Sequence, residues 1–300
     1  MSDAGDPTLP DGTLRGKIVL LTGANSGIGK AIALGLAELG ATLVLVCRNE
    51  VRGQAAKREI IEKTGIDSVE LITADLLLQS EVTRAAAEFL STHSHLDVLI
   101  NNAGAAFPSY AETEDGIERT MALNYFAPFL LTHLMLDALE KSAPSRVVNV
   151  ASVGHFGGKI NLDNLTRDHG MGMGGLGAYQ RSKLALVLFT YELARRLSGR
   201  QVTVNCLHPG AVRTNIWGHA GVWTPIARLA SLFMRSARSG ARTPIYLASS
   251  PELEGVTGRY YDDCKPTPSS EESYNKSLAL KLYDMSLRVT HLTEPETERA

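Results

Sequence analysis

The sequence predicts one α/β domain with a doubly wound, mostly parallel sheet that is covered by helices on both faces. Three features predict this fold class. Short apolar runs alternate with longer segments of helical periodicity along the chain. The runs, such as LVLV and VVNV, are apolar at consecutive positions, as in strands that are buried on both faces. A glycine-rich turn joins the first apolar run to the first helical segment.

Six apolar runs are the predicted strands, and helical segments lie between them. Because parallel neighbours are joined by right-handed crossovers, this alternation predicts an open, doubly wound sheet. The predicted strands are residues 17–22, 42–46, 69–73, 98–100, 146–150 and 202–207.

Two helical segments are the clearest. In the first, Ile28, Ile32 and Leu36 fall on one face of a helix, and Gly40 ends it. The second strong helical pattern covers residues 179–197. The first segment therefore presents one apolar stripe to the sheet.

The chain has 300 residues, of which 44% are apolar, enough to bury a full-sized core. We expect a single domain over residues 15–290, between flexible tails at 1–14 and 291–300. No apolar run reaches the roughly 18–20 residues that a transmembrane helix needs. The beginning of the sequence is polar and acidic, unlike a signal peptide, so we expect a cytoplasmic location.

Charge and cysteine usage argue against other classes of protein. The 30 Lys and Arg residues are balanced by 32 Asp and Glu residues, whereas a nucleic-acid-binding protein would usually have a basic surplus. No nucleic-acid partner is therefore expected. Cys47, Cys206 and Cys264 are too widely spaced for a disulfide framework or a zinc site, which favours a reducing compartment and no metal.

The glycine-rich turn has the features of a phosphate-binding site. Its glycines let the backbone come close to a pyrophosphate, and the following helix presents free N–H groups at its positive dipole end. Strand, turn and helix occur in the required order, although the spacing is G-x-x-x-G-x-G rather than the commoner G-x-G-x-x-G. The predicted cofactor-binding residues of the turn are Gly23, Asn25, Ser26, Gly27, Ile28 and Gly29.

Four motifs occur together: TGANSGIG at 22–29, NNAG at 101–104, Ser152, and YQRSK at 179–183. In this order they resemble the short-chain dehydrogenase/reductase family over most of the chain. The resemblance implies a Rossmann-type domain, a nicotinamide cofactor, and redox chemistry on the carbonyl or alcohol group of a small molecule. It also implies cofactor contacts from Asp75, Leu76, Asn102, Ala103, Gly104, Tyr179, Lys183, Pro209, Gly210, Val212 and Thr214.

The end of the second strand predicts which nicotinamide cofactor binds. An acidic residue there bonds the ribose 2′-hydroxyl of NAD and repels the 2′-phosphate of NADP. Here the position holds Cys47, and Arg48 follows with a guanidinium that can pair with a phosphate. NADP(H) is therefore favoured over NAD(H). A solvated Arg48, with its effect weakened by Glu50, is the alternative.

Tyr179 and Lys183 are the predicted catalytic pair, because a spacing of four places them one turn apart on the same helix face. A free phenol has a pKa of about 10, and we expect Lys183 and an oxidised nicotinamide to lower that of Tyr179 to about 7. Tyr179 is then the general acid in reduction and the base in oxidation. Ser152 can hydrogen-bond the substrate oxygen. Asn124 resembles the family's asparagine that holds a water between Lys183 and solvent.

Two departures from the general family pattern are informative. Ser152 and Tyr179 are 27 positions apart, which is longer than in many members. The extra segment at 157–177 and the motif GRYYDDC at 258–264 resemble the retinol dehydrogenase-like branch. The hydrophobic N-terminal anchor of membrane-bound retinol dehydrogenases is not evident. We therefore expect the mechanism of that branch, and transfer its substrate less firmly.

The segment 215–239 contains both tryptophans, Trp217 and Trp223. The resemblance places it over the substrate, so we expect a lid at about 211–243 and an apolar pocket for a lipophilic aldehyde, ketone or alcohol, such as a retinoid, steroid or long-chain aldehyde. Helix packing or a contact between subunits of a homo-oligomer is the alternative. Four nearby arginines suit either a solvated face or a peripheral membrane contact; they are Arg228, Arg235, Arg238 and Arg242.

The leading hypothesis is an NADP(H)-dependent oxidoreductase. Two alternatives stay open: an NAD-linked alcohol dehydrogenase that works mainly in oxidation, and a catalytically silent cofactor-binding regulator with the same fold. The regulator would usually lack the tyrosine or the lysine, and this chain has both Tyr179 and Lys183.

Overall fold

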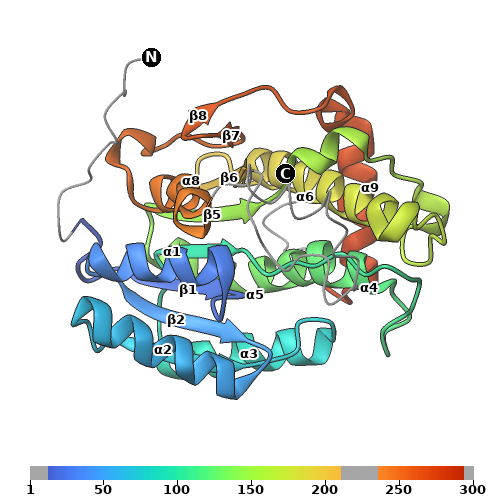
Figure 1. The fold of residues 1–300 in the computed structure, drawn as a ribbon. Coiled ribbons are helices and arrows are strands. Elements are labelled where there is room, and N and C mark those ends of the chain that lie inside the picture. Colours follow the sequence, from blue (N-terminus) through green and yellow to red (C-terminus); the bar gives the residue numbers. More distant parts are fainter. Residues whose placement is uncertain (1–12, 211–235, 294–300) are drawn as a thin grey trace, which may run out of the picture.

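A computed structural model describes residues 13–210 and 236–293 of the chain. A single eight-stranded sheet forms the centre of the molecule, in the order β3-β2-β1-β4-β5-β6-β7-β8 (Figure 1). The neighbouring strands from β3 to β7 are parallel, and β8 runs antiparallel to β7. The predicted fold class is therefore confirmed.

The six predicted strands are present, each within one or two residues of its predicted bounds. Two short strands at the edge of the sheet, β7 and β8, were not predicted. The strands are β1 (Ile18–Thr22), β2 (Thr42–Cys47), β3 (Val69–Thr73), β4 (Val98–Asn101), β5 (Ser145–Val150), β6 (Val202–His208), β7 (Tyr260–Asp262) and β8 (Lys265–Pro266).

The helices connect the parallel strands and cover both faces of the sheet, as crossovers require. The longer ones are α1 (Gly27–Glu38), α2 (Glu50–Thr64), α3 (Gln79–Thr92), α5 (Ala127–Lys141), α6 (Leu176–Arg196), α8 (Ala237–Ser249) and α9 (Lys276–Val289). The shorter helical segments are α4 (Arg119–Met121), η1 (Ala122–Phe126), η2 (Val153–Gly157), η3 (Leu162–Asn164), η4 (Met173–Gly175), η6 (Pro251–Leu253) and η7 (Glu271–Tyr274).

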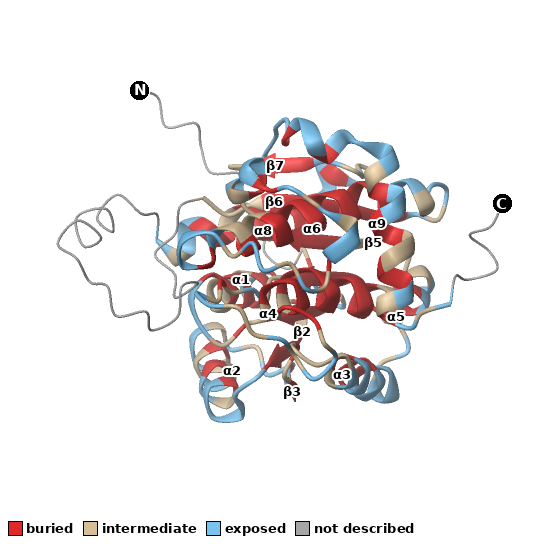
Figure 2. Ribbon diagram, turned by 90° about the vertical axis from the view of Figure 1, so that its right-hand side faces the viewer, coloured by how far each residue is buried: buried red, intermediate tan, exposed pale blue. Residues whose placement is uncertain are grey.

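Two apolar cores lie on opposite faces of the sheet. One is formed with α1, α2 and α8, and includes Leu36 and Leu247. The other is formed with α3, α5, α6 and α9, and includes Phe129 and Tyr283. Figure 2 shows buried residues along the central strands and the helix faces that meet them. Inner strands such as β1 and β2 are thus covered on both faces, which explains why their sequences are apolar at consecutive positions.

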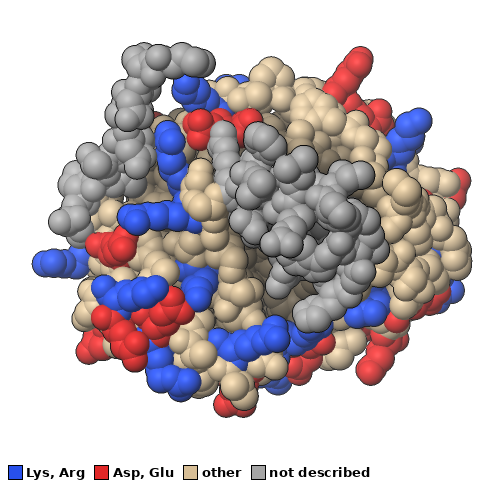
Figure 3. Space-filling view, in the orientation of Figure 1, with Lys and Arg blue, Asp and Glu red and all other residues tan. Residues whose placement is uncertain are grey.

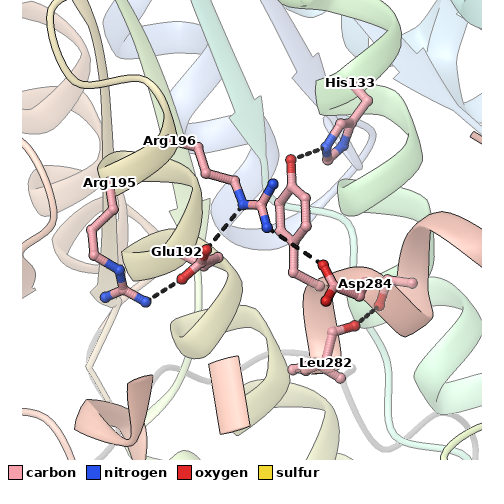
Figure 4. Close-up of polar contacts among 8 residues, drawn as sticks. His133, Glu192, Arg195, Arg196, Leu282 and Asp284 are labelled. Carbon is pink, nitrogen blue, oxygen red and sulfur yellow. Dashed lines mark hydrogen bonds and ion pairs between the residues drawn. The ribbon is translucent and has the colours of Figure 1, made fainter. Parts of the chain in front are cut away.

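Helix α9 is fastened to α5 and α6 by polar contacts within the second core (Figure 4). His133 of α5 lies 2.7 Å from the Tyr283 hydroxyl, and burial lowers the pKa of His133 to about 4, so this imidazole is neutral. The guanidinium of Arg196 lies 3.9 Å from the Tyr283 ring centre and pairs with Glu192 and Asp284. None of these residues is among the described residues that line the cleft at the end of the sheet.

The 23-residue stretch Arg119–Lys141 is long and apolar enough to cross a membrane by length and composition. Within its most apolar window, 78% of the residues are buried inside the protein, as in a core helix. On the face shown in Figure 3, the described Lys and Arg side chains are interspersed with Asp and Glu.

Leu14, which the sequence analysis assigned to the N-terminal tail, is packed against the domain. Leu14 is buried in the first core, and its amide donates to Leu39 O at 2.9 Å. At the other end, the Leu292 amide donates to Leu287 O. Apolar contact at Leu14 orders that residue within an otherwise polar stretch.

Candidate active site

A cleft of about 1100 Å³ lies at the carboxyl ends of the strands, next to β1 and β4. The chain order reverses between these two strands, since β2 and β3 lie on one side and β5 to β7 on the other. Such a switch point is where open α/β sheets bind ligands. Most of the predicted cofactor residues line this cleft: Gly23, Asn25, Ser26, Gly27, Ile28, Gly29, Arg48, Asp75, Leu76, Asn102, Ala103, Gly104, Tyr179, Lys183 and Pro209.

The glycine-rich turn leaves bare backbone along the wall of the cleft. Gly23 has a φ of +73°, which favours glycine, and a Cβ there would lie 2.9 Å from the Cα of Ala103. A Cβ on Gly29 would lie only 2.1 Å from Gly23 O. Helix α1 begins at Gly27, so its first amides lie at the turn. These features fit the pyrophosphate of a dinucleotide.

Residues from the tip of β4 hold this turn in place. The Thr22 hydroxyl accepts from the amides of Asn102 and Ala103, both at 3.0 Å. The Asn102 side chain donates to Thr22 O at 2.9 Å. Asn101 turns to the other side, where its amide donates to Thr132 and Asn149 in the core. Asn102 therefore supports the cofactor site, whereas Asn101 connects the sheet to helix α5.

The end of β2 combines a neutral residue with two cations. Burial raises the pKa of the Cys47 thiol to about 11, although amides of Ala24 and Asn25 bond it, so the thiol stays neutral. Arg48 and Arg52 both line the cleft. Arg52 was missed by the sequence analysis, although its position four residues after Arg48 at the start of a helix could have indicated it.

Asp75, at the end of β3, also lines the cleft. One of its carboxylate oxygens accepts from the Leu77 amide at 3.2 Å, so the residue caps its own loop. Asp75 therefore has a local structural role at the cleft, and its adenine-binding role stays a prediction.

The predicted catalytic side chains meet at the end of β5. Tyr179 and Lys183 are both buried on α6, and the Lys183 ammonium lies 5.8 Å from the Tyr179 ring centre. The ammonium donates to Val150 O at 2.8 Å. The Ser152 hydroxyl bonds the phenol and accepts from the Gly154 amide at 3.1 Å. The Ser152 hydroxyl and the phenol are therefore hydrogen-bonded to each other, and either oxygen can be the donor.

The expected pKa of about 7 for Tyr179 depends on Lys183 and an oxidised nicotinamide together, so it stays a prediction. Burial raises the pKa of Tyr179 above its ordinary value, and the bond from Ser152 only partly offsets this effect. Burial also lowers the pKa of Lys183 to about 8. The protein alone therefore keeps the phenol protonated at neutral pH, because desolvation of a phenolate outweighs the contacts that stabilise it.

Asn124 lies in a π-helical turn between α4 and α5, a feature that is frequent at functional sites. Its amide donates to Ala105 O and to the Ser182 hydroxyl, both at 2.9 Å, and its Oδ1 accepts from the Ala105 amide at 2.9 Å. Asn124 thus joins α6 to the loop after β4. The expected water between Asn124 and Lys183 stays a prediction.

Several predictions concern the segment after β6. Pro209 lines the cleft, and Gly210 has a φ of +83°. Val212, Thr214 and most of the expected lid lie outside the described residues, as do Arg228 and Arg235. Arg238 and Arg242, the other two arginines considered for a membrane contact, are described, and Arg242 lies 3.7 Å from Asp263. The lid and the membrane contact therefore stay predictions.

The burial of Lys183 predicts a measurable cost to stability. Below pH 8 the ammonium is charged in both the folded and the unfolded chain, so the folded state bears the full desolvation cost. We expect Lys183→Met to raise the free energy of unfolding at pH 7 by on the order of 2 kcal/mol. The substitution removes a desolvation cost of about 3 kcal/mol, which corresponds to the pKa shift, and loses a hydrogen bond that contributes about 1 kcal/mol.

The pH dependence separates this effect from simple repacking. Between pH 8 and 10.5 only the unfolded chain binds the proton, so the folded wild type gains stability and the difference from Lys183→Met shrinks. Urea denaturation at pH 7 and pH 9.5 measures this difference in the free energy of unfolding. Lys276→Met is the control, because Lys276 is exposed. A difference that grows with pH would contradict the argument.

The fold and the site together define a class of protein. A family model described as short chain dehydrogenase matches residues 17–224, so the chain belongs to the short-chain dehydrogenase family. Human retinol dehydrogenase 14 is 44% identical, covering 94% of this chain and 87% of that protein. Retinol dehydrogenase 12 of Bos taurus is 41% identical, covering 94% of this chain and 89% of that protein.

Solved structures agree with this assignment. A protein from Mycobacterium paratuberculosis has a TM-score of 0.77 and 32% identity, covering 96% of this chain and 97% of that chain. The Pseudomonas aeruginosa RhlG/NADP active-site complex has a TM-score of 0.69 and 26% identity, covering 84% of this chain and 96% of that chain. The protein is therefore an oxidoreductase that acts on alcohol or carbonyl groups and uses a nicotinamide cofactor.

Proposed function

We propose that the protein interconverts a lipophilic carbonyl compound and its alcohol with NADP(H). The observation that carries the proposal is the bonded pair of Ser152 and Tyr179 at a cleft whose opposite end presents two guanidinium groups. One end suits proton transfer to an oxygen atom, and the other suits a phosphate that NAD lacks.

The protein has residues for each part of the cofactor. The glycine-rich turn and the amides of α1 suit the pyrophosphate, Asp75 and Leu76 suit the adenine, and Lys183 suits the ribose beside the nicotinamide. Such a cofactor supplies hydride-transfer chemistry when bound.

The protein's own residues then manage the proton. The Ser152 hydroxyl can donate its proton in a hydrogen bond to the substrate carbonyl oxygen, once that oxygen lies between Ser152 and Tyr179. Tyr179 gives its phenolic proton to that oxygen in reduction and takes it back in oxidation. Lys183, with its charge close to the phenol, stabilises the phenolate that results.

The preference for NADP is supported by the end of β2. A neutral Cys47 does not repel a 2′-phosphate, and Arg48 and Arg52 can each pair with it. Glu50, which could weaken the effect of Arg48, is exposed and is not among the described residues that line the cleft.

Substitution of both arginines tests the preference. We expect Arg48→Asp combined with Arg52→Gln to lower kcat/KM for NADPH relative to NADH by about 100-fold, since each charge-assisted contact contributes about 1.5 kcal/mol. Arg58→Gln is the matched control, because Arg58 is exposed on the same helix and is not among the described lining residues. An unchanged ratio in the double variant would favour the NAD-linked alternative.

The lipophilic substrate is supported by two observations. The similar proteins of human and Bos taurus are named retinol dehydrogenases. The wall of the cleft beyond the catalytic residues is mostly apolar, with Ala105, Ala106, Phe107, Pro108 and Leu123. A site of this kind binds the hydrocarbon part of a ligand and leaves orientation to a few polar groups.

A panel assay tests the substrate class. With NADPH in excess, kcat/KM is measured for retinal, a steroid ketone, a long-chain aldehyde and an aldose sugar. We expect higher values for the lipophilic compounds. Faster turnover of the sugar would overturn the proposed class, and an absence of turnover with all four would favour the regulator.

A further inference from the structure

His155 lies directly behind Ser152 in helix η2 and is completely buried. Its Nδ1 lies 2.6 Å from Ser152 O, and its Nε2 accepts from the Ser270 amide at 2.9 Å. The imidazole therefore connects the backbone of Ser152 to a segment more than one hundred residues later. Sequence reasoning did not select this residue.

The two contacts determine the tautomer of the ring. The Ser270 amide can only donate, so Nε2 of His155 must be unprotonated. In the neutral ring the proton is then on Nδ1 and is donated to Ser152 O. The ring is also held by Tyr260 and Phe156, whose ring centres lie 4.8 and 4.3 Å away. Its orientation is therefore fixed on both edges and on its faces.

The partner segment is itself fixed to the catalytic helix. Tyr191 of α6 bonds the Ser269 hydroxyl at 2.6 Å, and that hydroxyl bonds Ser273 at 2.7 Å. The Ser269 amide donates to the Tyr274 hydroxyl at 3.1 Å. Through these contacts the helix that contains Tyr179 also holds the anchor of His155.

We propose that His155 is a positioning residue, which fixes Ser152 relative to Tyr179 by connecting the Ser152 carbonyl to the segment 269–274. This inference rests on the proposed function, because Ser152 needs positioning only if it bonds a substrate oxygen. The Ser152 carbonyl also accepts from the backbone amide of His155 at 3.1 Å, and a substitution of the side chain keeps that bond. Loss of the imidazole, however, releases η2 from the Ser270 amide and lets the Ser152 hydroxyl shift relative to the phenol. Small displacements of such groups have large effects on kcat.

Three substitutions separate the two contacts of the ring. His155→Asn keeps an amide donor near the position of Nδ1, His155→Gln keeps an acceptor near that of Nε2, and His155→Phe keeps the ring but neither bond. We expect kcat to fall by about 30-fold in His155→Phe and His155→Gln, and by less than about 3-fold in His155→Asn. The affinity for NADPH, measured by fluorescence titration, is expected to stay constant.

His133→Phe is the matched control. His133 is also buried, with Nδ1 2.7 Å from Phe129 O and Nε2 2.7 Å from the Tyr283 hydroxyl, but it lies in the α5–α9 contact shown in Figure 4. The control should lower Tm about as much as His155→Phe and leave kcat unchanged. Nitrogen-15 spectra of the cofactor-free wild type should show a proton on Nδ1 of His155.

The outcomes are distinguishable. An active wild type whose kcat is unchanged in His155→Phe, or equally lowered in His155→Asn and His155→Phe, would overturn the positioning role alone. An equal loss of kcat in His133→Phe would also overturn it, since the effect would then be general loosening. A proton on Nε2 would contradict the hydrogen-bond assignment on which the role depends. A wild type that turns over no carbonyl compound would overturn the proposed function and this inference together.

Discussion

Replacing Tyr179 by phenylalanine should lower kcat for carbonyl reduction by roughly 1000-fold, within the range attributed to general acid catalysis. The phenol is the group that Ser152 bonds and that Lys183 approaches, so its loss removes the proton donor from the site. The ring itself remains, because phenylalanine keeps the buried apolar surface. Cofactor affinity and Tm should therefore change little.

The control for this variant is Tyr283→Phe on α9. It removes a buried phenolic hydroxyl that is bonded to His133 of α5. It should lower stability slightly and leave kcat unchanged. Full activity of Tyr179→Phe in steady-state NADPH consumption would contradict the assignment of the acid. A loss of activity accompanied by loss of cofactor binding would instead indicate a structural role.

The pH dependence of the reaction follows from the same residue. Burial raises the pKa of Tyr179, so the phenol stays protonated through neutral pH and is competent as an acid. Reduction should then keep its rate between pH 6 and 8, whereas oxidation, which needs the phenolate, should speed up as the pH rises. The expected pKa of about 7 requires the charge of an oxidised nicotinamide as well as that of Lys183, so it stays a prediction for the enzyme with bound cofactor.

The elements that could be predicted are those whose own residues show a recognisable sequence pattern. Apolar runs identified strands β1 to β6, and the run is most continuous in strands such as β1 and β2, whose residues are buried on both faces. The edge strands β7 and β8 have no such run. Tyr260–Asp262 becomes a strand by pairing with β6 and β8, and its own three residues do not indicate these partners.

The same distinction applies to the site. The glycine-rich turn, Ser152, Tyr179 and Lys183 were recognisable because each lies in a short motif. The role of His155 depends on Ser270, which is remote in sequence, so no spacing rule relates the two. Arg52 lies between these cases, because a helix begun by the Asn49 cap places it one turn after Arg48, on the cleft.

The other large expected effect is that of Gly29→Ala, in which one methyl group should strongly weaken cofactor binding. The added carbon would lie 2.1 Å from Gly23 O and 2.6 Å from the Asn102 amide nitrogen, closer than any real contact. Because the first neighbour is backbone, the turn itself must move. We expect the free energy of unfolding to fall by about 3 kcal/mol, as in severe overpacking. The affinity for NADPH should fall by on the order of 100-fold, because the amides around the turn lose their common direction.

Gly65→Ala separates displacement of the turn from ordinary glycine strain. Gly65 has a φ of +71° and nothing within 4 Å of its would-be Cβ, and it lies at the end of α2, near the amino end of β3 and away from the cleft. This control should cost about 1 kcal/mol of stability and leave cofactor affinity unchanged. Denaturation and fluorescence titration on both variants measure the two effects. Equal affinities for NADPH in Gly29→Ala and the wild type would mean that the cofactor does not approach this turn, and the cleft would then have to be assigned to another ligand.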